Sequence, residues 1–149
     1  MPHACRELGF AMYSMLIYVR NFGSQLSQFE KIELESNVPE WFKDNTRELI
    51  KLKLTFSELS NLEHINGLRK ELFSLSQSAS CEKELSIIIT ERSKIIVEVL
   101  LYARKIILFE ERFTREYDYK PGLHQDRYER LIAEVNEIAK ELDLHLPPL

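Results

Sequence analysis

The sequence has few residues that interrupt a helix, since only 4 of its 149 residues are Gly and only 5 are Pro. Between Leu68 and Lys120 there is no Gly, Pro or Asn, and the part from Cys81 to Phe113 is dense in Ile, Val, Leu, Tyr and Phe. A stretch of this length without turn-forming residues is typical of one long helix preceded by a linker. The sequence therefore predicts an all-α fold.

Motifs of known chemistry are also missing. The sequence has no Gly-rich phosphate loop, no GxSxG nucleophile motif and no Cys with a neighbouring His. None of the four histidines stands in the HxxxH, HExxH or ExxH spacing that brings two metal ligands to one face of a helix: His3, His64, His124 and His145. We therefore expect no cofactor, no metal site and no enzymatic activity, although a catalytic site without a motif stays an alternative.

Charge and hydropathy limit the partners that we expect. The formal net charge is −4 and the basic residues are balanced by nearby acids, so a nucleic-acid footprint is missing. No segment reaches the ~20 apolar residues of a membrane span. The apolar segment 8–19 imitates a signal-peptide core, but Glu7 precedes it and no cleavage site follows. We read it as a structural helix and expect a cytoplasmic protein.

The two cysteines, Cys5 and Cys81, lie far apart in the sequence and form no CxxC or Cys/His cluster. This pattern favours free thiols in a reducing compartment over a disulfide. The chain is also long enough to bury a sizeable core without a crosslink or a metal, because a domain of this size buries ~68–70% of its unfolded surface.

The length indicates a single helical domain over residues 1–149, and apolar spacing divides it into about five helices. In the N-terminal third, apolar residues recur in alternating steps of four and three, which predicts a helix over about 4–34: Leu8, Met12, Met15, Val19, Phe22, Leu26 and Phe29. Gly9 and Gly23 lie inside it, and each marks either the close approach of a neighbouring helix or a tolerated weak point.

Further helices are predicted over about 39–58, 61–76, 82–117 and 124–143. The apolar spacing changes near Ser60, which favours two helices over one kinked helix between 39 and 76. The small polar tract 74–80 reads as a loop, and Pro121-Gly122 ends the long helix. The β-branched runs 86–90 and 95–99 could form strands, but residues 91–94 make a poor hairpin turn.

The long helix over 82–117 is the most informative element. Between Ile95 and Phe109, 12 of 15 residues are apolar, so the helix has to be covered over most of its circumference. It is either the central helix of the bundle or the face of a two-fold dimer, because a continuous rod of ~54 Å would project beyond a compact bundle. The candidate partner-binding residues lie along one ridge: Val99, Tyr102, Ile106, Phe109, Phe113 and Tyr117.

These features predict a non-catalytic adaptor or assembly protein that binds a protein partner and self-associates through the long helix. One alternative is an immunity-type or inhibitory protein that neutralises a basic target. Another is a bundle that senses a small molecule, which predicts an apolar cavity lined by Met15, Val19 and Tyr102. A membrane-surface helix is the least favoured option, because Glu91 and Glu98 share the polar face of the long helix.

Overall fold

A computed structural model describes residues 4–35, 39–55, 62–117, 125–144 and 146. At residues 23–35, 50–55, 62, 113–114, 116–117 and 125–126 the description covers the backbone alone. The described residues form the helices α1 (Cys5–Glu35), α2 (Glu40–Thr55), α4 (Leu62–Leu75), α5 (Cys81–Tyr117) and α6 (Gln125–Glu141), and they include no strand. The all-α prediction is confirmed.

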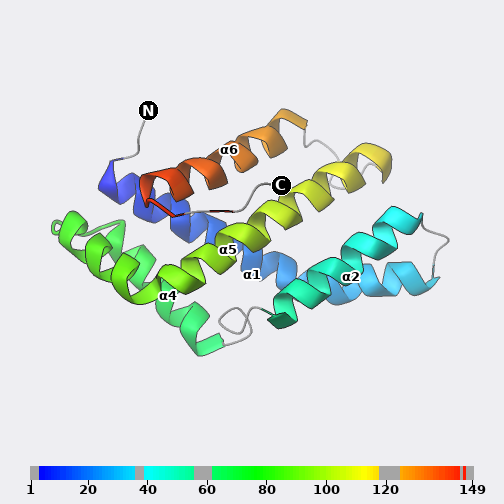
Figure 1. Ribbon diagram of the computed structural model, residues 1–149, viewed down its shortest axis with the longest axis horizontal. Helices are drawn as coiled ribbons and strands as arrows, with labels where there is room; N and C mark the ends of the chain where they lie inside the picture. Colours follow the sequence, from blue (N-terminus) through cyan, green and yellow to red (C-terminus); the bar gives the residue numbers. More distant parts are fainter. Residues whose placement is uncertain (1–3, 36–38, 56–61, 118–124, 145, 147–149) are drawn as a thin grey trace.

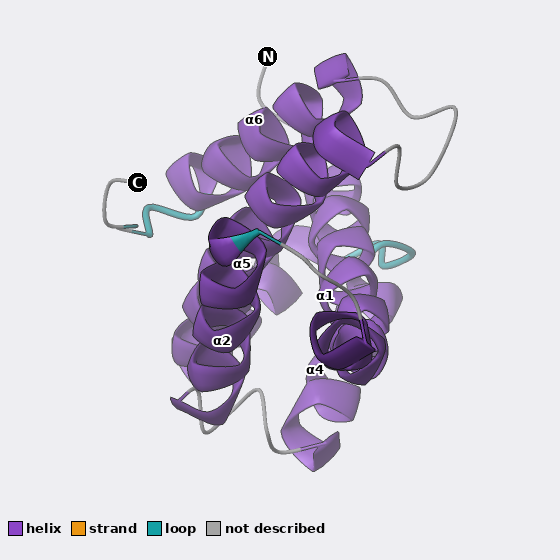
Figure 2. Cartoon of the chain, turned by 90° about the vertical axis from the view of Figure 1, so that its right-hand side faces the viewer, coloured by secondary structure: helices purple, strands orange, loops and turns teal. Residues whose placement is uncertain are grey.

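Two helices, α1 and α5, form the centre of the bundle. Each of them contacts the other and also α2, α4 and α6, whereas the three outer helices contact only this central pair within the described residues. Figure 1 shows α5 crossing the molecule, with α6 on one side and α2 and α4 on the other. In the perpendicular view of Figure 2, α2 and α4 lie on opposite sides of the bundle. Of the two alternatives for the long helix, α5 takes the central position and α1 shares it, whereas self-association stays a prediction.

The central helices run parallel, because Cys5 lies beside Cys81 at their starts and Phe22 contacts Phe109 about five turns later in α1 and about eight turns later in α5. The outer helix α2 runs antiparallel to α5, since Trp41 packs near Phe109 and Glu48 pairs with Lys105. The outer helices α4 and α6 flank α5 in sequence and fold back on it. Each outer helix can therefore offset part of the dipole of the central pair.

The fold buries the residues that the apolar spacing of the sequence identifies. Along α1, the described members of the predicted stripe are all buried. The apolar residues that recur in α4 and α6 are buried too, with the half-buried exception of Leu131: Ile65, Leu68, Leu72 and Leu75 in α4, Tyr128, Val135 and Ile138 in α6, and Leu142 directly after α6. Buried residues from all five helices make one hydrophobic cluster. Leu26 and Phe29 of the predicted stripe lie outside the described side chains. Helix boundaries fall within three residues of those predicted, and residues 56–61, where the spacing changes, lie outside the described residues.

Gly9 marks a close approach between helices. A Cβ at this position would lie 3.0 Å from Leu75 Cδ2 of α4, which is closer than ordinary van der Waals contact. The glycine therefore lets α1 and α4 pack with little space between them. Of the two explanations for the glycines inside α1, close packing is correct at Gly9, and Gly23 lies outside the described side chains.

The long helix is not a straight rod, because Arg92 has non-helical backbone angles (φ −124°, ψ 15°). The Thr90 hydroxyl donates a hydrogen bond to the Ser86 carbonyl, a local bond that often bends a helix. The Arg92 side chain reaches Glu71 of α4 through two nitrogens, at 3.3 and 3.1 Å. The sequence predicted a continuous helix and missed this kink, which falls within the segment 91–94.

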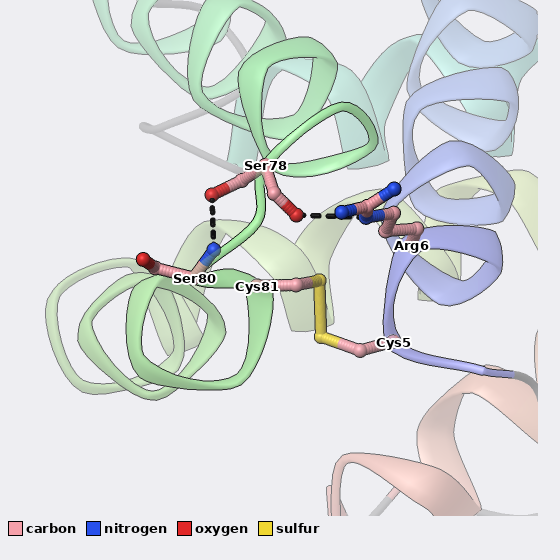
Figure 3. The surroundings of a disulfide bond; sticks show 5 residues. All are labelled: Cys5, Arg6, Ser78, Ser80 and Cys81. Carbon is pink, nitrogen blue, oxygen red and sulfur yellow. Dashed lines mark hydrogen bonds between the residues drawn. A yellow bond between two sulfur atoms is a disulfide. The ribbon is translucent and has the colours of Figure 1, made fainter.

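A disulfide joins Cys5 at the start of α1 to Cys81 at the start of α5, with the Cα atoms 6.0 Å apart (Figure 3). The prediction of free thiols is wrong, because two cysteines 76 residues apart in sequence begin parallel neighbouring helices. Disulfides are typical of oxidising compartments. Cytoplasmic localisation stays a prediction, but its argument from reduced cysteines no longer applies.

None of the described helices combines the length and apolarity that crossing a bilayer requires.

We expect reduction of Cys5–Cys81 to lower the free energy of unfolding by about 2–4 kcal/mol, because the crosslink closes a long loop in the unfolded chain. Urea unfolding with and without dithiothreitol measures this difference. The double variant Cys5→Ser/Cys81→Ser is the control and should show no response to the reductant. Equal stability of the oxidised and reduced wild-type protein would contradict the expectation.

Candidate functional site

The structure buries the described part of the predicted partner-binding ridge of α5 within its own bundle. Val99, Tyr102, Ile106 and Phe109 are each at most 4% exposed. Phe109 packs its ring against Phe22 of α1 and Phe42 of α2, with ring centroids 6.0 and 5.6 Å apart. The side chains of Phe113 and Tyr117 lie outside the described part of the chain. A second copy is therefore not needed to shelter the described part of this ridge.

Charged residues on α5 also find partners in the same chain. Lys105 pairs with Glu48 of α2 at 3.2 Å, and the Arg112 guanidinium lies 4.3 Å from the centre of the Trp41 ring. Trp41 in turn packs against Phe109. Contacts of this kind fasten α2 along α5, as expected for a central helix.

We expect Ile106→Glu to lower the free energy of unfolding by roughly 3 kcal/mol or more, because it places a charge where the native side chain is fully buried. The matched control is Leu108→Glu, two residues away on the same helix, where the side chain is 39% exposed. Thermal and urea unfolding of both variants measure the contrast. If the Ile106→Glu protein is as stable as the control, the placement of this ridge is wrong.

The two most exposed of the large apolar side chains in the described residues lie elsewhere, on α1 and α4, followed by Ile87 and Leu108 on α5. Phe10 is 59% exposed and Phe73 is 48% exposed, although both are large aromatic residues. Tyr13 lies between them, with its ring centroid 6.4 Å from that of Phe10 and 5.6 Å from that of Phe73. We call these three residues the aromatic patch. Adjacent aromatic rings at the surface are typical of a binding site, because they combine large area with few rotatable bonds.

An open groove of about 880 Å³ begins at this patch. One wall is α1, the other is the first half of α6, and the loop between α4 and α5 closes one end. The lining residues are Arg6, Glu7, Phe10, Ala11, Ser14, Met15, Tyr18, Ser76, Gln77, Arg127, Leu131 and Glu134. Apolar side chains and charges of both signs thus share one surface.

The groove is anchored to the core at Tyr18. The Tyr18 hydroxyl donates a hydrogen bond to the carboxylate of Glu110 on α5, and Glu110 is 1% exposed. Buried carboxylates are costly unless they are hydrogen-bonded, so this contact fixes how α1 lies on α5. Tyr18 is half-buried and also lines the groove, so its ring belongs both to the core and to the candidate site.

The interior leaves little room for a small molecule near Met15. The internal space there holds about 10 Å³, about the size of one water molecule, and is lined by Met12, Met15, Leu16, Leu68, Leu72, Ile96, Val99 and Leu100. Val19 and Tyr102, the other residues of the predicted cavity, do not line it. The described residues also include no group of three or more His, Cys, Asp or Glu side chains placed to hold a metal ion.

Tyr102 is buried for packing and not for hydrogen bonding. It is 1% exposed, and its hydroxyl has no hydrogen-bond partner among the described residues. Burial raises the pKa of Tyr102 to about 12, because the phenolate would be poorly solvated inside the bundle. An unfolded tyrosine ionises near pH 10, so the folded state loses stability as the pH rises from about 10 to 12.

We expect Tyr102→Phe to change stability at pH 7 by less than about 1 kcal/mol, because the hydroxyl that it removes makes no hydrogen bond. The same substitution should reduce the loss of stability between pH 10 and 12, since the ionising group is gone. Urea unfolding at pH 7, 10 and 11 measures both effects. The control is Tyr13→Phe, whose phenol belongs to the aromatic patch. An unchanged alkaline slope in Tyr102→Phe would contradict the assignment.

Comparison with protein-family models, with curated protein sequences and with solved structures finds no significant match to this chain. The aromatic patch and the groove were not predicted from the sequence. Phe10 and Phe73 each fall between the positions of the apolar stripe of their helix, at Leu8 and Met12 in α1 and at Leu72 and Leu75 in α4. A large aromatic residue outside the buried stripe is the signal that could have found them.

Proposed function

We propose that this protein is a non-catalytic binding protein that docks an amphipathic helix of a partner protein in the groove between α1 and α6. The observation that carries the proposal is the aromatic patch, in which Phe10 and Phe73 stay about half exposed and Phe10 also lines the groove. An adaptor or an inhibitory protein would both work through such a surface. The proposal keeps the expected interaction function and moves its site from α5 to α1.

The shape of the groove supports a helical occupant. The residues of α1 that line it come from four successive turns, at 6–7, 10–11, 14–15 and 18. At a rise of 1.5 Å per residue this wall is ~18 Å long, the length of about three helical turns. An amphipathic helix places apolar side chains at the same spacing, i, i+3/i+4 and i+7, and recognition of this kind is common.

The charges at the groove also fit an amphipathic helix. Arg6 and Glu7 lie at one end, and Arg127 and Glu134 lie on the α6 wall. A rim that carries both positive and negative charges suits a helix whose apolar face is flanked by acids and bases. A nucleic acid would be repelled by the acidic residues of the rim, and a uniformly basic peptide would be repelled by its arginines. The apolar floor of Ala11, Met15 and Leu131 would receive the buried face of such a helix.

A library of amphipathic helical peptides displayed on phage provides a defined probe. We expect the selected peptides to lose at least tenfold in affinity for Phe10→Ser/Phe73→Ser, because truncation of central aromatic residues removes much of the binding energy. Fluorescence anisotropy measures the affinity, and amide chemical shifts locate the peptide. The matched control is Ile87→Ser, which removes an apolar side chain that is 47% exposed on α5.

The outcomes of this experiment are distinct. Shifts confined to α1, α6 and the part of α4 around Phe73, together with the selective loss, support the proposal. Peptides that bind Phe10→Ser/Phe73→Ser as tightly as the wild type, or that shift α2 or the centre of α5 instead, overturn it. Light scattering of the wild-type protein tests the alternative that a second copy of the chain occupies the groove. A dimer that dissociates in Phe10→Ser/Phe73→Ser would replace the foreign helix with self-association through this patch.

A further inference from the structure

The disulfide lies beside an open depression at one end of the bundle. Cys5 lines an open depression of about 640 Å³ formed by the starts of α1 and α5 and the end of α6, together with Leu8, Glu82, Leu85, Ser86, Ile89, Thr90 and Glu141. Cys81 is 7% exposed and does not line this depression, whereas Cys5 is half-buried. Cys5 is thus the more exposed of the two cysteines, so we take its sulfur as the point of attack and Cys81 as the leaving group.

The fold does not depend on this bond for its core. The buried cluster runs through all five helices, and the disulfide lies at one end of it, at the first residue of both central helices. A chain of this length can bury enough surface to fold without a crosslink. Reduction should therefore leave the bundle folded and act only on the segments that the disulfide ties together.

Those segments form one end of the groove. Cys5 begins the turn of α1 that carries Arg6 and Glu7, and Cys81 follows the loop that carries Ser76 and Gln77; these four residues line the groove. Besides the disulfide, a hydrogen bond of 2.8 Å from the Arg6 Nε to the Ser78 carbonyl joins the two segments at an exposed position (Figure 3). An exposed hydrogen bond competes with water and contributes little net stability.

We propose that Cys5–Cys81 is a reversible thiol–disulfide switch that fixes this end of the groove when oxidised and releases it when reduced. A thiolate attacks the Cys5 sulfur, forms a mixed disulfide and expels the Cys81 thiolate, which takes a proton. A second thiol attacks the outer sulfur of the mixed disulfide and leaves Cys5 as a thiol. The two reductant thiols are oxidised to one disulfide, and the protein disulfide gains two electrons and two protons.

Two features favour exchange at this site. Both cysteines are the first residues of helices, where the positive end of the helix dipole stabilises a thiolate. The carboxylates of Glu82 and Glu141 share the depression with Cys5, so an anionic thiol is repelled from the reactive sulfur. The reductant class that fits is a neutral dithiol, and glutathione, which is anionic at neutral pH, should react more slowly.

The switch is tested on the purified full-length chain by hydrogen exchange before and after reduction with dithiothreitol. We expect exchange of the hydrogen-bonded amides of Leu8 and of residues 76–78 to become at least tenfold faster, while residues 99–107 in the centre of α5 keep their protection. Thiol alkylation and mass measurement follow the redox state, and air oxidation should restore the original exchange pattern. The variant Cys5→Ser/Cys81→Ser should show the reduced pattern and no response.

Three results would overturn the switch. The bond could stay oxidised in native protein under excess dithiothreitol, reduction could unfold the whole bundle, or exchange at the two segments could stay unchanged.

The rate of reduction by different thiols is a second test. We expect dithiothreitol to reduce the bond at least fivefold faster than glutathione at equal thiolate concentration, and Glu82→Gln/Glu141→Gln should narrow this ratio. If the variant leaves the ratio of the two reduction rates unchanged, the proposed preference for a neutral dithiol is wrong.

The effect of the switch on binding rests on the proposed function and is measured separately. Peptides selected on the oxidised protein should bind the reduced protein at least tenfold more weakly, because the end of the groove at Arg6 and Gln77 is no longer fixed. If no peptide binds either state, the proposed function fails and the exchange experiment still decides the switch. If peptides bind both states equally while exchange changes, control of the groove by the disulfide is wrong.

Discussion

The burial of the apolar circumference of α5 is the constraint on which the rest of the structure depends. A helix with so few polar residues in its centre has to be covered on almost every side, and here four helices of the same chain supply the cover. The pairing of α1 with α5 is the largest part of it and includes the contact between Phe22 and Phe109 and the hydrogen bond from Tyr18 to Glu110. Once these two helices are fixed, the outer helices have only the remaining faces to occupy.

The candidate site follows from this arrangement. Because α1 gives one face to α5 and others to α2, α4 and α6, the side chains between its buried positions remain at the surface beside α6. Phe10 lies at such a position, and Gly9 next to it lets Leu75 of α4 approach closely enough for Phe73 to join the aromatic patch. The aromatic patch and the groove thus lie where α1, α4 and α6 come together at the surface, on elements that the core holds in place.

The sequence predicted what depends on periodicity and missed what depends on spatial arrangement. Steps of three and four identify the buried residues of α1, α4 and α6, because a helix repeats every 3.6 residues whatever surrounds it. The same pattern cannot show whether the apolar ridge at Val99 and Ile106 packs against other helices of its own chain or against a second copy of the chain. Nor can it show that Cys5 and Cys81 start parallel neighbours, since this depends on the order of helices in space. Arg92, at the kink, pairs with Glu71, a residue of another helix, and this contact also depends on spatial arrangement.

The parallel course of α1 and α5 has a consequence for synthesis on the ribosome. Parallel helices cannot be joined by a short connection, so α2 and α4 come between them in the chain, whereas α4, α5 and α6 follow one another directly. Contacts within α4, α5 and α6 are close in sequence and can form early. The stripe of α1 emerges first and waits for α5, its main cover, to be translated. During that interval the nascent chain presents Leu16, Val19 and Phe22 to water, and this is where a chaperone would be most useful.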